Sequence, residues 1–119
     1  MKRGTTNENL AALIVRLEKA SKANKAPLWA ALARRLSKAH RAMAEVDAMS
    51  LDKRVPQGSA AVVPGVVLGS GKAGYTGTVA ALRFSASARA SLAKAGAKPL
   101  TIEALLAANP KGTNVAIIV

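Results

Sequence analysis

The stretch that most constrains the fold of this chain is residues 60–84, AAVVPGVVLGSGKAGYTGTVAALRF. It consists of two valine-rich apolar runs on either side of a loop with several glycines. β-branched residues pack well on a pleated sheet, and glycine supplies the turns between short strands. The pattern therefore predicts two buried strands joined by a glycine-rich loop, and it puts the centre of the core here.

The loop contains Gly69-Ser70-Gly71-Lys72-Ala73-Gly74, which has the GxGxxG spacing of dinucleotide-binding turns. That fingerprint requires a helix directly after the glycines and an acid about 20 residues later. Here we expect residues 75–79 to continue as strand, and Glu103 is the only acid after Val55. A P-loop also fits poorly, because its glycine spacing differs and an alanine stands where magnesium needs a hydroxyl. The sequence favours a strand-to-strand loop with one lysine.

The 119 residues fit one domain that can bury a core. Cysteine is absent and there is one histidine, which excludes disulfides, thiolate metal sites, cysteine nucleophiles and histidine pairs. Hydrolytic or redox enzymes are difficult to build from this inventory. We expect no catalytic residue, no metal site and no cofactor.

The charge balance is strongly basic, with 18 Lys and Arg against 6 acids, a net charge of +12 and an isoelectric point near 11.1. A small domain with this excess repels itself unless a polyanion neutralises it, so nucleic acid is the simplest partner. No run of about 20 apolar residues exists, and polar residues follow the start Met1-Lys2-Arg3-Gly4. We expect a soluble, cytoplasmic protein that does not enter a membrane.

Residues 1–8 are polar and are expected to form a flexible arm, with a helix starting at Thr5 or Asn7. The apolar residues of this helix recur at i, i+3, i+4 and i+7: Leu10, Leu13, Ile14 and Leu17. Pro27 fits the first turn of a second helix with a leucine stripe. The two helices should pack as a hairpin, and Trp29 on the apolar face is predicted to be core rather than a platform for a base.

The polar side of the second helix is basic, because Arg34, Lys38 and Arg41 recur at i, i+4 and i+7. Like charges at this spacing destabilise an isolated helix, so the row needs another explanation. Between Arg16 and Arg41 there are eight Lys or Arg and one acid, Glu18. We interpret this one-signed excess as a phosphate-binding face rather than as a merely solvated one.

The acids Glu45, Asp47 and Asp52 make up half of the chain's total. No further metal ligand accompanies them, so we expect salt bridges to nearby Lys and Arg rather than catalysis. Residues 45–49 suggest a short strand, and residues 50–55 a capped turn of helix.

After a turn at residues 56–59, the expected order is β-β-α-β-α-β, an α/β body with helices covering a sheet. The first of these helices is capped by Ser85 and ended by Gly96, and strand 97–100 follows. The second is capped by Thr101 and stopped at Asn109-Pro110, before a last strand at 114–119. We expect residues 1–54 to form the basic arm and helices and 55–119 the body, together one structural unit.

Both parts are basic: residues 1–54 hold twelve Lys or Arg and five acids, net +7, and residues 55–119 hold six and one, net +5. A footprint spread over the surface fits embedding in folded RNA better than one helix reading a DNA groove.

Several short stretches occur in an order that resembles a known family. They are Pro27-Leu28-Trp29, Ala33-Arg34-Arg35-Leu36, Ala44-Glu45-Val46, Val62-Val63-Pro64-Gly65, Val67-Leu68-Gly69-Ser70-Gly71, Val79-Ala80-Ala81, Phe84-Ser85, Leu100-Thr101-Ile102-Glu103 and Asn109-Pro110-Lys111-Gly112. Over nearly its full length the chain resembles the archaeal and eukaryotic large-subunit ribosomal protein eighteen-e family, a relative of bacterial large-subunit protein fifteen.

The resemblance implies a non-catalytic constituent of the large ribosomal subunit that binds rRNA beside neighbouring ribosomal proteins and takes no small-molecule substrate. It also implies an N-terminal helical extension and a body of irregular ββα units. The family commonly carries a denser arginine run after the second helix, whereas this chain retains Lys38, His40 and Arg41 there.

The predicted RNA contacts are the cations of the arm, the two helices and the exposed loops. Arginines would bind phosphates bidentately, and Lys72 would approach RNA from the glycine-rich loop. The set is Lys2, Arg3, Arg16, Lys19, Lys22, Lys25, Arg34, Arg35, Lys38, His40, Arg41, Lys53, Arg54, Lys72 and Lys111. Two alternatives remain: a free-standing RNA- or DNA-binding protein outside the ribosome, and a small nucleotide-dependent enzyme that uses residues 69–74.

Overall fold

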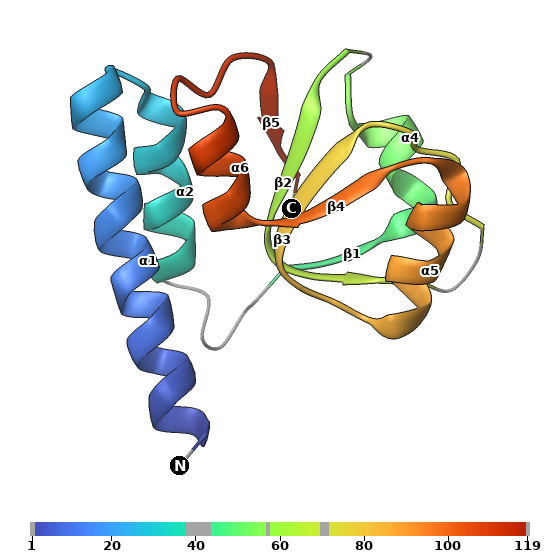
Figure 1. The fold of residues 1–119 in the computed structure, drawn as a ribbon, viewed down its shortest axis with the longest axis horizontal. Coiled ribbons are helices and arrows are strands. Elements are labelled where there is room, and N and C mark those ends of the chain that lie inside the picture. Colours follow the sequence, from blue (N-terminus) through green and yellow to red (C-terminus); the bar gives the residue numbers. More distant parts are fainter. Residues whose placement is uncertain (1, 38–43, 57, 70–71, 119) are drawn as a thin grey trace.

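The valine-rich stretch forms the two central strands of a five-stranded sheet, β2 (Ala60–Leu68) and β3 (Thr78–Phe84). The computed structural model describes residues 2–37, 44–56, 58–69 and 72–118, and the side chains among them from residue 10 onward. All strand pairs are parallel, and the fold is mixed α/β with a helical hairpin before the sheet (Figure 1). The predicted fold class and the buried central strands are confirmed.

One edge of β2 pairs with two short strands in succession. β5 (Val115–Ile117) pairs with its first half, and β1 (Ala44–Asp47) pairs with its second half. Between the two halves, at Val63 and Val66, the register with β3 shifts. Pro64, which has no N–H to donate, lies at this irregularity, where proline is tolerated within a sheet. On the far side of β3, β4 (Lys98–Thr101) completes the sheet.

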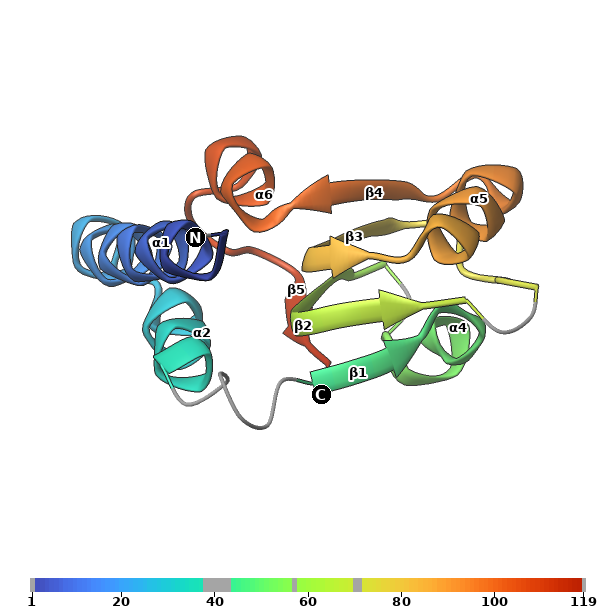
Figure 2. The same cartoon turned by 90° about the horizontal axis from the view of Figure 1, so that it is seen from below.

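Helices cover both sides of the strands. The hairpin of α1 (Lys2–Asn24) and α2 (Pro27–Ser37) lies on one side with α6 (Ile102–Ala108), and α4 (Leu51–Arg54) and α5 (Ala86–Ala95) lie on the other (Figure 2). Alternate strand residues point to opposite faces, so each face has its own core. Val62 and Ala80 pack with the hairpin and α6, whereas Val63 and Val79 pack with α4 and α5.

The hairpin forms as predicted, and Trp29 is fully buried at its centre. Its indole Nε1 donates a hydrogen bond of 2.7 Å to the carbonyl of Pro110, in the loop after α6. Leu17, Leu32 and Leu36 are also fully buried. The interpretation of Trp29 as core is confirmed.

The flexible arm is a wrong prediction for the backbone of residues 2–8. α1 begins at Lys2, not at Thr5 or Asn7. Extending an existing helix adds one hydrogen bond for each residue fixed, and residues 2–8 contain no proline to prevent the extension. The first turns of α1 therefore run past the end of α2 (Figure 1).

The caps of the later helices are confirmed. The Ser85 side chain accepts from the Ala88 N–H at 3.1 Å, and that of Thr101 accepts from the Ala104 N–H at 3.1 Å. Gly96 ends α5 with φ of 92°, in the left-handed region.

The segment after β1 differs in detail from the expectation. The strand ends at Asp47, and a 3₁₀ turn, η1 (Ala48–Ser50), precedes α4. Asp47 caps this turn by accepting from the Met49 N–H at 2.9 Å, whereas the Ser50 hydroxyl donates to the Asp47 carbonyl. An aspartate carboxylate is well placed to accept from the backbone N–H two residues later, and this bond favours a turn. The turn ends the strand at Asp47, although the apolar residues after it suggested a longer strand.

Candidate nucleic-acid interface

Every Lys and Arg side chain that the structure describes is exposed to solvent. No charged side chain in the described part of the chain is buried. The described cations are therefore on the surface, and their grouping there decides what they can bind.

The first group lies along the outer face of α1. Arg16, Lys19 and Lys22 follow one another at steps of three residues, so they form a slanted row around the helix. Leu13 and Leu17 are buried in the core shared with α2, so the row borders that core and faces solvent. The exposed Glu18 is the acid within this row.

The second group is at the end of α2. Arg34 and Arg35 occupy its last turn and are exposed on the outer face of the helix. The opposite face buries Trp29, Leu32 and Leu36. Cations near a helix C-terminus also interact favourably with the helix dipole, which is a structural reason for their presence. Lys38, His40 and Arg41, predicted to continue this row, lie outside the described residues.

A third group forms at the opposite end of the hairpin. Lys25, with φ of 52°, makes the turn between α1 and α2. The loop that carries Lys111 packs on the first turn of α2, through the Trp29–Pro110 hydrogen bond and through Gly112. A Cβ on Gly112 would lie 2.8 Å from Cδ2 of Leu28, so the backbone there approaches the helix closely. The fold thus brings the turn between α1 and α2, with Lys25, and the loop after α6, with Lys111, to one end of the molecule (Figure 1).

The remaining predicted contacts lie away from the hairpin. Lys53 and Arg54 end α4, on the other side of the strands, and Lys72 is in the loop between β2 and β3. The predicted residues therefore form several separate groups around the molecule rather than one patch. For Lys2 and Arg3, the structure describes only the helical backbone.

Four further exposed cations are absent from the predicted set. They are Arg83 on β3, Arg89 and Lys94 on α5, and Lys98 at the start of β4. The Arg89 guanidinium carbon lies 5.2 Å from the ring centre of Phe84, within cation–π range. The absence of any acid between Asp52 and Glu103 is the sequence signal that could have included them.

The acidic side chains that the structure describes show no arrangement typical of catalysis. Asp47 is a helix cap, and Glu45 and Asp52 are exposed. Over the described ranges, no group of three or more His, Cys, Asp or Glu is placed to hold a metal ion.

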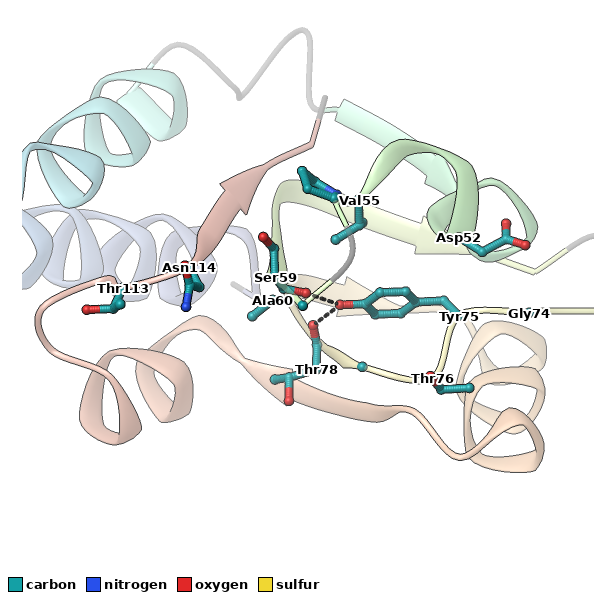
Figure 3. Close-up of a pocket in the computed structure, with 13 residues that line it drawn as sticks. Asp52, Val55, Ser59, Ala60, Gly74, Tyr75, Thr76, Thr78, Thr113 and Asn114 are labelled. Atoms are coloured by element: carbon teal, nitrogen blue, oxygen red, sulfur yellow. Dashed lines mark hydrogen bonds between the residues drawn. The ribbon is translucent and has the colours of Figure 1, made fainter.

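The glycine-rich loop leads into a strand and not into a helix. Residues 72–77 are irregular and β3 begins at Thr78, so the expectation of strand from residue 75 is three residues too early. The Tyr75 hydroxyl explains the delay, because it shares its proton between the carbonyls of Ser59, at 2.9 Å, and Thr78, at 2.8 Å (Figure 3). These bonds hold residues 75–77 in a turn. Burial of the ring raises the pKa of Tyr75 above 10.0, and a backbone hydrogen bond from Ala61 opposes this.

Among the helices described, none combines the length and the apolar character needed to cross a membrane.

Comparison with known proteins gives a consistent result over the whole chain. Residues 1–119 match the family model described as ribosomal protein 60S L18 and 50S L18e. Similar proteins named large ribosomal subunit protein eL18 occur in Methanococcus maripaludis (39% identical over 96% of this chain and 95% of the relative) and in Methanosphaerula palustris (42%, 95% and 93%). Another occurs in Archaeoglobus fulgidus (42% identical, 96% and 97%).

Proposed function

Because this chain belongs to the family of ribosomal proteins 60S L18 and 50S L18e, we propose that it binds folded large-subunit rRNA through its exposed Lys and Arg side chains. Membership of the family makes it a structural, non-enzymatic constituent of the large ribosomal subunit. In the subunit, cations on separate surfaces of the protein would neutralise phosphates of RNA strands that would otherwise repel one another.

The observation that carries this proposal is the complete exposure of the described cations on a chain of net charge +12. An isolated protein gains nothing from such an excess, because the charges repel one another. Contacts with phosphates replace this repulsion by attraction between opposite charges. An arginine can bind a phosphate through two N–H groups at once.

The distribution of the groups supports a role in holding several RNA segments. The α1 row, the arginines at the end of α2 and the pair Lys25 and Lys111 are on different parts of the hairpin, and Lys53 lies beyond the sheet. Because the hairpin and α6 pack on one face of the sheet and α4 and α5 on the other, the fold sets the separations of these groups. We also propose neighbouring ribosomal proteins as partners, on the basis of the family alone.

The test is the affinity of the purified protein for archaeal large-subunit rRNA as salt is raised. If about 6 to 10 phosphates are neutralised, the association constant should fall about 10³- to 10⁵-fold between roughly 50 and 200 mM salt. The double variant R34Q/R35Q should bind more weakly and reduce the slope of log K against log salt by about 1 to 2. Its circular dichroism spectrum should not change, because both side chains are exposed.

A matched control removes two exposed cations outside the predicted set, in the variant R83Q/K94Q. It carries the same net charge as R34Q/R35Q and should retain more of the affinity. An affinity independent of salt would contradict phosphate binding altogether. Equal losses in the two variants would mean that overall charge matters and that the end of α2 has no particular role.

A further inference from the structure

The proposed phosphate contacts leave unused a cavity of about 750 Å³ at the amino ends of three strands. Ala60 begins β2, Thr78 begins β3, and Asn114 directly precedes β5; all three line it (Figure 3). A cavity of this volume is in the range of small-molecule sites. Among the described residues that line it, none is Lys or Arg.

The cavity presents polar side chains that have no partner in the protein. The hydroxyls of Thr76, Thr78 and Thr113 and the amide of Asn114 make no hydrogen bond within the part of the chain that the structure describes. The Tyr75 hydroxyl, in contrast, is already bonded to two carbonyls. Apart from the Asp52 carboxylate, the open positions are therefore uncharged donors and acceptors.

Asn114, at the edge of the cavity, has an unusual backbone conformation. Its φ is 56°, which is uncommon for a residue other than glycine and is tolerated by asparagine. Its carbonyl accepts from the Ala60 N–H at 2.7 Å, so the strained residue is tied to the start of β2. Such conformations concentrate at binding sites, where the surrounding structure holds a side chain in one direction.

Charge around the cavity argues against a phosphate inside it. The lining residue Asp52 carries its carboxylate beside Gly74, where Oδ2 lies 2.8 Å from the position of an added Cβ. Two exposed lysines are neighbours of lining residues: Lys53 follows Asp52 in sequence, and Lys98 pairs with Thr78 across the sheet. The interior is neutral or acidic and the surroundings are basic.

We propose that this cavity binds the base and ribose of one unpaired RNA nucleotide, whose flanking phosphates are met by Lys53 and Lys98. Unpaired nucleotides expose base edges and a 2′-hydroxyl, and these are the groups that uncharged donors and acceptors recognise. Apolar surface from Val55, Pro56 and Tyr75 would contact the face of the base. The inference rests on the proposed rRNA binding, and it adds recognition of RNA shape to a charge-based attraction.

The test compares two RNA hairpins that differ only by one bulged nucleotide in the stem. At equal salt, the protein should bind the bulged RNA about tenfold more tightly, the effect of one or two well-made hydrogen bonds. The variant T76V/T78V/N114G removes three polar groups. Valine keeps the shape of threonine, and glycine adopts positive φ freely. This variant should bind both RNAs equally, with its affinity for the paired hairpin unchanged.

The control S21A removes a hydroxyl outside the cavity and should keep the tenfold preference. If the triple variant does not fold, N114G alone, which relieves backbone strain, should still reduce the preference about threefold. A preference retained in these variants, or none in the natural protein, would overturn the nucleotide site and leave the phosphate contacts standing. Failure to bind either RNA would overturn both proposals.

Discussion

The hairpin and the central strands differ in how closely their backbones approach neighbouring elements. In the hairpin, large side chains fill the interface: Trp29, Leu32 and Leu36 are fully buried between α1, α6 and the sheet. Within β2 and directly after it, two glycines let backbones meet. A Cβ on Gly65 would overlap the Ala44 carbonyl, and one on Gly69 would lie 2.5 Å from the Ala88 nitrogen.

This difference determines which substitutions each region tolerates. A region that depends on filled volume is damaged when atoms are removed, because a cavity remains. A region that depends on close backbone approach is damaged when atoms are added, because backbone cannot move aside as a side chain can. We therefore expect truncation to be most harmful in the hairpin and enlargement to be most harmful in the strands.

The largest effect should come from Trp29→Ala. It removes a fully buried indole and its hydrogen bond to Pro110, and it should lower the free energy of unfolding by about 3 to 5 kcal/mol in urea denaturation. Trp29→Phe keeps most of the volume and loses only the N–H, so it should cost less than half as much. A loss below about 1 kcal/mol for the alanine variant would show that the hairpin does not depend on this side chain.

A smaller effect, of about 1 to 3 kcal/mol, is expected from Gly65→Ala. The added methyl group meets the backbone of Ala44, so β1 and β2 must separate locally. The control is Gly74→Ala, whose methyl group meets only the flexible Asp52 carboxylate and should be nearly neutral. Equal stability of the two variants in thermal unfolding would remove the contrast between the regions.

The smallest effect concerns Tyr75, a buried side chain in the irregular segment that precedes β3. Tyr75→Phe should cost about 1 kcal/mol, because it removes the bonds to the Ser59 and Thr78 carbonyls. The raised pKa of Tyr75 means that the folded state holds the phenolic proton more tightly than the unfolded state. Its contribution is therefore complete below pH 10.0 and is lost as pH rises above that value.

The difference in stability between the natural protein and Tyr75→Phe should accordingly shrink in urea titrations from pH 9 to pH 11. Comparing the two proteins at each pH cancels the titration of the lysines. A constant difference would mean that the hydroxyl titrates alike in the folded and unfolded states.

Local patterns predicted much of the fold. Leucine spacing located the hairpin, and Ser85, Gly96 and Thr101 marked helix ends, because caps depend on a few neighbouring residues. The pairing of β1 and β5 with two halves of one strand could not be predicted in this way. It depends on contacts between residues far apart in sequence, such as Ala60 with Val115.

The sequence predicted that the candidate interface consists of exposed cations, but it did not predict which of them lie together in space. An unpaired Lys or Arg is costly to bury, so exposure of the described cations follows from the sequence alone. That Lys25 lies at the same end as Lys111 follows from the Trp29–Pro110 bond, which no sequence pattern indicates. The cavity beside Tyr75 was likewise missed, because its lining residues come from three separate segments.

The shared edge of β2 has a consequence for synthesis of the chain. Residues 60–62 emerge from the translating ribosome long before residues 115–117, which pair with them. Until then, their outward N–H and C=O groups remain an open template for any passing strand. The newly made protein is thus most prone to wrong association just before its last strand is complete.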